Sequence, residues 1–212
     1  MRDAFGECQT RVTLPDALSQ RGRAGSPSMS IQPKARMSVE EFLAWAEHQP
    51  DRFELFDGEV FAMAPQRVRH VEAKFAVQLA LRGGIREAGL PCLMLPDGVT
   101  VRIDDATSFE PDALVYCGPR LDADAIAAPA PVIVVEVLSP STGRIDTGQK
   151  LVGYFRVSSL MHYLIVDPVR RMMIHHKRGA DGLIETRLAA GGTIDLTPPG
   201  FRLDDSACLT EP

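Results

Sequence analysis

The chain has 212 residues, of which 45% are hydrophobic and 24% are charged. These are ordinary values for a globular protein, and the length suits one domain with a sizeable core. The net charge of −5 argues against a strongly basic surface for nucleic acid, since affinity for phosphates comes mainly from Lys and Arg, but it does not exclude an enzyme that acts on DNA. No apolar run reaches the roughly 18 residues of a membrane span, so we expect a soluble protein with no membrane partner.

The cysteines bear on the cellular compartment. Cys8, Cys92, Cys117 and Cys208 include no CxxC pair, so the sequence predicts neither a zinc site of common spacing nor a disulfide framework. The N-terminus also lacks the continuous apolar segment of a secretory signal. We therefore expect a cytoplasmic protein.

The first 36 residues differ in composition from the rest. They are rich in Gly, Ser, Pro, Gln and Arg and have few periodic apolar positions, which indicates a disordered or loosely attached basic tail. Residues 37–212 are predicted to form a single domain. The tail is either an extension without a role, such as one from an upstream start codon, or a basic arm that touches DNA.

The domain is predicted to begin with a helix and a hairpin. Ser38-Val-Glu-Glu41 is a capping box, which predicts a helix that ends near Pro50. Asp57-Gly58 then separates two short apolar runs and tolerates the positive φ angles of a tight hairpin turn. Glu54 lies in the first strand of this hairpin.

A longer helix and several strands follow. Apolar residues at near-helical spacing predict a helix over residues 68–88 that packs on a sheet, with His70 in its first turn. Strands are expected at 92–95, 99–103, 112–116, 131–138, 162–166, 172–176 and 183–188, and a helix carrying Asp146, Lys150 and Tyr154 follows the fourth. The segment around 198–200, rich in Pro and Gly, is predicted to be a loop that wraps the sheet edge. The apolar positions of the long helix are Val68, Val71, Phe75, Leu79 and Ile85.

Glu136 is the residue that this pattern does not explain. Five of the six residues from Val132 to Val137 are aliphatic, as in a strand buried on both faces. An ionised carboxylate in such a strand would cost several kcal/mol unless a cation, a donor or a metal lies beside it. If this strand pairs with the one that Asp112 opens, the two carboxylates can share Mg²⁺ or Mn²⁺, both of which prefer oxygen ligands.

Lys150 is a second candidate partner for Glu136. Asp146, Lys150 and Tyr154 are spaced by four residues and share one helix face. The plainer interpretation is an exposed Asp146–Lys150 ion pair. The alternative is that Lys150 reaches back to the sheet and supplies the cation that Glu136 needs. His175 and His176 are adjacent in a strand and point to opposite faces, so we interpret them as structural residues.

These motifs, taken in order, resemble a known family. Glu-Pro-Asp112, Val-Val-Glu136-Val-Leu-Ser-Pro-Ser-Thr, Asp146-x-x-x-Lys150-x-x-x-Tyr154 and His-Tyr-Leu-Ile-Val-Asp-Pro168 are similar to the Uma-two family of restriction-endonuclease-like proteins, within the PD-(D/E)XK nuclease superfamily. The resemblance covers about residues 38–203. It implies an α/β restriction-endonuclease-like fold, with a mixed β-sheet flanked by α-helices.

The resemblance also implies a function and a site. It implies a Mg²⁺-dependent or Mn²⁺-dependent endonuclease that hydrolyses phosphodiester bonds in DNA, with Asp112, Glu136 and the carbonyl of Val137 as metal ligands. The superfamily lysine is expected two residues after Glu136, where Leu138 stands. Lys150 is therefore implied to have taken over its role from the next helix, which a long flexible ammonium can do.

Three accessory residues are open to two interpretations each. Glu54 is either a further ligand or a solvent-side residue of the hairpin. His70 is either a substrate or water contact or a surface or helix-capping histidine. Tyr154 either packs or binds phosphate. A homodimer is possible because superfamily members that cut both strands are commonly dimers. The rival to the enzyme is a degenerate member that binds nucleic acid or protein, and a small phosphate ester as substrate is a third reading that lacks a Gly-rich phosphate cradle.

Overall fold

The first helix begins where the capping box predicts. The computed structural model describes residues 36–139 and 147–209. Helix α1 (Val39–Ala46) starts after Ser38, whose hydroxyl accepts the N–H of Glu41 while the Glu41 carboxylate accepts the N–H of Ser38. Val39 and Phe42 are buried against Leu55, so the apolar side of the helix covers the hairpin that follows it.

A small sheet contains that hairpin. β1 (Phe53–Phe56) and β2 (Glu59–Ala62) pair around Asp57 and Gly58, which have φ angles of 48° and 74°, so the predicted turn is confirmed. β5 (Ser108–Phe109) pairs with β1 on one side and with β4 (Val101–Arg102) on the other. The strand predicted over 99–103 is therefore only two residues long, and β5 was not predicted.

The large sheet carries most of the core. It has six strands in the order β10-β9-β8-β7-β6-β3, and only the β7–β8 pair is parallel. The predicted α/β class with a mixed sheet is confirmed. Its strands are β3 (Cys92–Pro96), β6 (Ala113–Cys117), β7 (Pro131–Val137), β8 (His162–Asp167), β9 (Met172–Arg178) and β10 (Ile184–Ala189).

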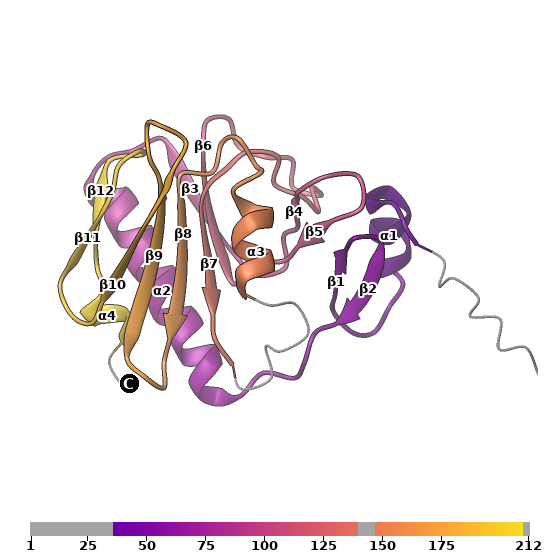
Figure 1. The fold of residues 1–212 in the computed structure, drawn as a ribbon, viewed down its shortest axis with the longest axis horizontal. Helices are drawn as coiled ribbons and strands as arrows, with labels where there is room; N and C mark the ends of the chain where they lie inside the picture. The colour runs from indigo at the N-terminus through magenta and orange to yellow at the C-terminus, as the bar shows by residue number, and fades with distance from the viewer. Residues whose placement is uncertain (1–35, 140–146, 210–212) are drawn as a thin grey trace, which may run out of the picture. The chain divides into compact units, whose positions relative to one another are not determined.

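Two helices cover opposite faces of this sheet (Figure 1). α2 (Val68–Glu87) packs on the face that presents Val115, Ile133 and Val135, whereas α3 (Thr147–Tyr154) packs on the face that presents Leu114 and Val134. Alternate residues of one strand thus enter different cores. Buried on both faces, β7 is the apolar strand that the sequence predicted.

The buried face of α2 differs from the predicted one. Among the spaced apolar residues only Ile85 is buried, whereas Val68 and Phe75 are 73% and 60% exposed. The inward face instead carries Ala73, Val77 and Leu81, together with the polar residues His70 and Lys74. The spacing of apolar residues predicted the helix but not which of its faces is buried. Polar residues near its start turn toward the sheet because they contact acidic side chains at the ends of the strands.

The C-terminal segment is a hairpin and not the predicted loop. β11 (Thr193–Leu196) pairs with β12 (Phe201–Asp204), and α4 (Ser206–Leu209) follows. A Cβ on Gly84 would lie 2.5 Å from the Phe201 ring, so a glycine is needed where α2 meets this hairpin. The Pro and Gly residues form the connection between the strands and concealed the hairpin from sequence inspection.

The predicted absence of disulfides is also wrong. Cys92 in β3 and Cys117 in β6 are direct partners in the sheet and form a disulfide, whereas Cys208 is free and buried. The 25 residues between the first two cysteines give no hint of this register. Within the described ranges, we find no helix with the length and apolar character to cross a membrane. The proposed boundary at residue 36 stays a prediction.

Candidate active site

Asp112 and Glu136 are placed by two neighbouring strands of the large sheet. Strands β6 and β7 are antiparallel, with Ala113 opposite Val135, and the N–H of Asp112 donates to the Val135 carbonyl at 2.9 Å. The Val137 N–H donates to Asp112 Oδ2 at 2.6 Å. The strand pairing that the sequence required is therefore present, and it places the first carboxylate at the start of β6 beside the end of β7.

Lys150 connects Glu136 to a carboxylate from the small sheet. Its Nζ donates to Glu136 Oε1 and to Glu54 Oε1, both at 2.8 Å, and the Tyr154 hydroxyl donates to the same oxygen of Glu136 at 2.7 Å. All four residues are buried. The interpretations of Lys150 as an exposed ion pair and of Glu54 as a solvent-side residue are therefore wrong; Asp146 lies outside the described residues.

The position of α3 depends on a glycine beside an aromatic ring. A Cβ on Gly153 would lie 2.7 Å from the ring of Phe109, so only a glycine lets the helix come this close without displacing that ring. Lys150 Nζ lies 5.5 Å from the centre of the same ring. This distance suits a cation–π contact, which holds the ammonium over the strand ends.

A second buried ammonium lies beside Asp112. Lys74, on the inward face of α2, lies 2.9 Å from Asp112 Oδ1 and donates to Asp97 Oδ2 at 2.6 Å. Arg52 also donates to Asp97 Oδ2 at 2.6 Å and forms an ion pair with Glu110. We call the buried charged residues of both groups the strand-end cluster: Glu54, Lys74, Asp112, Glu136 and Lys150.

His70 lies at the edge of this cluster. Its Nε2 lies 3.6 Å from Asp112 Oδ1, and its Nδ1 is buried with no hydrogen-bond partner among residues 36–139 and 147–209. The ring is 7% exposed, so it is not the surface histidine of the plainer interpretation. One turn of α2 brings His70 and Lys74 to the same carboxylate.

Burial sets the proton affinity of the group around Lys150. Burial raises the pKa of Glu136 to about 7, against the opposing effect of Lys150, and the charges of Glu54 and Asp112 raise it further. The pKa of Glu54 is likewise raised by burial. Burial lowers the pKa of Lys150, but the charges of Glu136 and Glu54 outweigh this and the pKa is raised. The lysine therefore stays charged.

The pKa of Asp112 moves in the opposite direction from that of Glu136. Burial favours the protonated form, but contacts from His70, Lys74 and the Val137 N–H outweigh it, so the pKa of Asp112 lies below its ordinary value. Catalytic sites typically contain two neighbouring carboxyl groups whose pKa values are shifted in opposite directions by their surroundings. Asp112 is a fixed anion, and Glu136 exchanges its proton near neutral pH.

The oxygen-rich donor set fits a hard divalent cation in its chemistry. Carboxylate oxygens suit Mg²⁺ or Mn²⁺, which keep several water ligands and need only one or two carboxylates from a protein. Within the described ranges, no group of three or more His, Cys, Asp or Glu side chains is arranged to hold a metal. A cation bound by Asp112 and Glu136 would therefore need water or backbone oxygens as its other ligands.

The comparisons with known proteins agree on a family. The model of the Uma2 family, described as "Putative restriction endonuclease", matches residues 39–206, which include every residue of the strand-end cluster. The chain belongs to the Uma2 family. The resemblance inferred from the motifs is confirmed.

Relatives of this Uma2 protein are found in cyanobacteria. "Uncharacterized protein slr1290" from Synechocystis sp. (strain ATCC 27184 / PCC 6803 / Kazusa) is 32% identical over 84% of this chain and 92% of its own, and "Uncharacterized protein sll1609" is 25% identical over 68% and 82%. A crystal structure from Anabaena variabilis ATCC 29413, titled a "putative nuclease belonging to DUF820", has a TM-score of 0.64 and 14% identity. It covers 82% of this chain and 97% of the other. That match supports a nuclease fold.

The Uma2 structure brings the predicted site residues together. Asp112, Glu136 and Lys150 converge, Glu54 and Tyr154 contact this group, and His70 lies beside Asp112. Val137 contributes its N–H to Asp112, and its predicted role as a carbonyl ligand stays a prediction.

Sequence inspection missed three residues of the site: Lys74, Asp97 and Arg52. Asp97 precedes Gly98 and so has the pattern of an Asp-Gly turn, although its carboxylate accepts hydrogen bonds from both Lys74 and Arg52. The sequence does contain a sign of Lys74. It lies four residues after His70 and so shares a helix face with it. That signal becomes visible only when α2 is turned so that His70 faces the sheet.

Proposed function

We propose that this protein is a divalent-metal-dependent endonuclease that hydrolyses phosphodiester bonds in DNA. The observation that carries the proposal is the convergence of Asp112 and Glu136 at neighbouring strand ends, with Lys150 on the second of them. Its membership in the family described as "Putative restriction endonuclease" supports the same chemistry. Burying this many charges costs folding free energy, and a site that handles a phosphate gives a reason to keep them.

The proposed metal is Mg²⁺ or Mn²⁺, held by Asp112, Glu136 and the carbonyl of Val137. When bound, such an ion lowers the pKa of a coordinated water and neutralises negative charge on the phosphate. The N–H of Val137 fixes one oxygen of Asp112, so the other oxygen faces Lys74 and His70. Asp112 is thereby oriented before any ligand arrives.

Lys150 supplies a permanent positive charge in this proposal. Its two carboxylate partners keep it protonated, and a fixed ammonium stabilises the negative charge that develops on the phosphate or orients the attacking water. Glu54 positions Lys150 and does not need to touch the substrate, and Tyr154 fixes the carboxylate of Glu136. His70 is proposed to contact substrate or water through its ring.

A catalytically degenerate module that binds nucleic acid or protein is the second candidate. Leu138 occupies the position of the superfamily lysine, and Lys74 already neutralises Asp112 in this structure. A protein that retains the fold but only binds would keep such internal ion pairs. Cleavage distinguishes it from the enzyme.

The test is incubation of purified protein with plasmid and with single-stranded DNA in Mg²⁺ or Mn²⁺. Asp112→Ala, Glu136→Ala and Lys150→Ala are each expected to reduce cleavage by about 100-fold or more, the usual effect of removing a group that stabilises the transition state. His175→Gln, outside the site, is the matched control and keeps wild-type cleavage. Cleavage that survives all three alanine substitutions would overturn the site, and a wild type that cleaves no nucleic acid would favour the degenerate module.

A further inference from the structure

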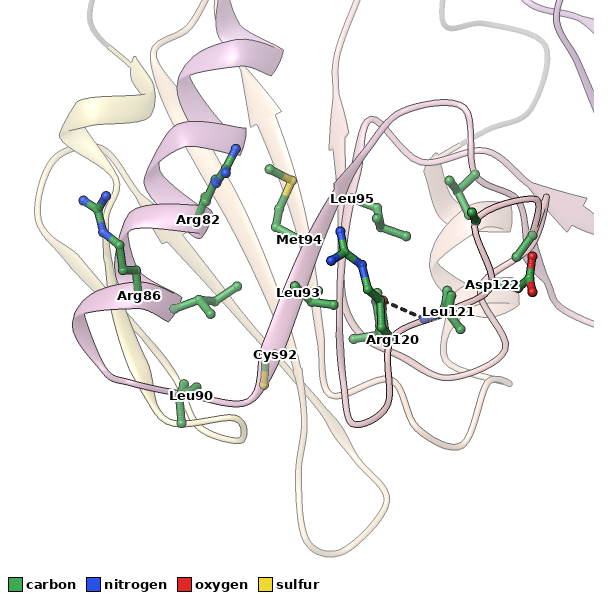
Figure 2. A pocket seen from close by; sticks show the side chains of 15 residues that line it. Arg82, Arg86, Leu90, Cys92, Leu93, Met94, Leu95, Arg120, Leu121 and Asp122 are labelled. Carbon is green, nitrogen blue, oxygen red and sulfur yellow. Dashed lines mark hydrogen bonds between the residues drawn. The ribbon is translucent and has the colours of Figure 1, made fainter.

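A pocket of about 830 Å³ lies along the edge strand of the large sheet. Figure 2 shows Arg82 and Arg86 projecting from α2 on one side of β3 and Arg120 on the other side. The wall between them is apolar. Its residues include Leu90, Leu93, Met94, Leu95 and Leu121.

The three arginines of this pocket are not neutralised by the protein. Arg82 and Arg86 are exposed, and none of the three has an ion-pair or hydrogen-bond partner within the described ranges. Asp122 is the single acidic residue that lines the pocket there, and its carboxylate accepts the N–H of Asp124. In a chain of net charge −5, this is a local excess of positive charge.

Arg82 and Arg86 also repel each other. They are four residues apart on one helix, so their guanidinium groups lie on the same face, where like charges destabilise a helix by a few tenths of a kcal/mol. A bound anion would remove this cost. Arginine is suited to the task because its planar group donates two parallel hydrogen bonds to a phosphate.

One end of the pocket lies two residues along the chain from a residue that contacts the strand-end cluster. Leu95 lines the pocket, β3 ends at Pro96, and the next residue, Asp97, holds Lys74. Lys74 and Arg82 lie eight residues apart on α2, about 12 Å along its axis at 1.5 Å per residue. At about 3.4 Å per phosphate along one strand of a duplex, this separation corresponds to three or four nucleotides.

We propose that this pocket, the arginine pocket, binds the DNA backbone that flanks the scissile phosphate. Arg82 contacts a phosphate three or four nucleotides from the cleavage point, Arg86 and Arg120 contact further backbone phosphates, and the apolar wall takes the deoxyribose and base edges. This inference rests on the proposed nuclease function. It deepens that function by assigning substrate affinity to a surface separate from the residues that carry the chemistry.

The experiment measures binding of labelled duplex DNA in EDTA, so that no cleavage occurs, across a range of salt concentrations. Each arginine that contacts a phosphate contributes about 0.9 to the slope of log affinity against log salt. The triple variant Arg82→Ala, Arg86→Ala, Arg120→Ala is therefore expected to lose about 2 to 3 from this slope and at least tenfold in affinity. Arg187→Ala, an exposed arginine on the opposite edge strand β10, is the matched control and binds like wild type.

A cleavage assay with two substrates separates the possible failures. Wild type is expected to cut a long duplex faster than one that ends before the arginine pocket, and the triple variant to lose this preference while cutting the short duplex normally. Unchanged DNA affinity, salt slope and length preference in the triple variant would overturn the arginine pocket but leave the nuclease standing. A wild type that neither binds nor cuts DNA would overturn both proposals.

Discussion

Two clusters of buried polar side chains include residues of the large sheet, and they differ in how the buried groups are compensated. The strand-end cluster brings three acidic side chains and two lysines together as ion pairs. The histidine cluster, formed by His162 and His175, contains no charge at neutral pH. Burial lowers the pKa of His162 and His175 to about 4.

The histidine cluster is completed by neutral hydrogen bonds. His162 shares hydrogen bonds with His175 at 2.9 Å and with the Pro198 carbonyl at 2.8 Å, and on the other face of the strand His176 bonds to Thr186 at 2.8 Å. Neutral groups with partners cost little to bury, whereas charged groups cost several kcal/mol each even when paired. The strand-end cluster is therefore kept at the expense of stability, as expected of a functional site.

The largest effect is expected from removing the cation of the strand-end cluster. Lys150→Met leaves Glu54 and Glu136 buried without their ammonium, which should lower the free energy of unfolding by about 3 to 5 kcal/mol, the usual cost of breaking a buried pair. Urea unfolding measures it. The double variant Lys150→Met, Glu136→Gln should recover part of the loss, and a single variant as stable as wild type would contradict the charged state of the cluster.

The next effect is a loss of stability as pH rises. In EDTA, the pKa of Glu136 is about 7 in the folded protein against 4.5 for an ordinary glutamate, so the folded state binds the proton more tightly. Its contribution is present in full below about pH 4.5 and is lost as pH rises through about 7, a change of about 3 kcal/mol. Melting temperatures across this range should fall in wild type and fall less in Glu136→Gln. Parallel profiles for the two proteins would count against this environment for Glu136.

The histidine cluster should respond to pH in the opposite direction and by a similar amount. The pKa of His162 falls from 6.5 to about 4 on folding, so its neutral form contributes stability above about pH 6.5 that is lost as pH falls through about 4, a change of about 3 kcal/mol. The acid side of the same melting profile measures this, and His162→Gln should flatten it. A profile whose acid side is identical in that variant would assign the loss to carboxylates such as Asp112.

The smallest effect is expected from a substitution that keeps a hydrogen-bonding group in the histidine cluster. His175→Gln should cost about 1 kcal/mol, the worth of one hydrogen bond, and leave DNA cleavage unchanged. Urea unfolding and the plasmid assay measure the two quantities side by side. Loss of cleavage with retained stability would place a function in the histidine cluster and remove the contrast between the two regions.

Much of the strand-end cluster was predictable from sequence because its residues interrupt strong local patterns. Glu136 stands out in an apolar strand, Asp112 opens the strand beside it, and the helical spacing of Lys150 and Tyr154 points both at one place. The capping box at Ser38 and the Asp57-Gly58 turn are likewise local signals with a known geometry. Features that depend on residues close together in the chain could therefore be predicted from the sequence.

What could not be predicted depends on orientation and register. The outward direction of Phe75 and the inward direction of Lys74 follow from how α2 lies on the sheet, and the Cys92–Cys117 disulfide follows from the pairing of β3 with β6. Neither is encoded in the spacing of residues along one element. Asp97 looked like an ordinary turn residue because its partners lie 23 and 45 residues away.

The most direct test of the strand-end cluster as a metal centre is to measure Mn²⁺ binding to the purified protein by calorimetry. We predict one bound Mn²⁺ per chain, lost in Asp112→Asn and in Glu136→Gln and retained in His175→Gln. A raised melting temperature of wild type in Mn²⁺ would accompany it, because a ligand that binds only the folded state stabilises that state. A wild type that binds no Mn²⁺ at millimolar concentration, or binds it equally well without either carboxylate, would contradict the account.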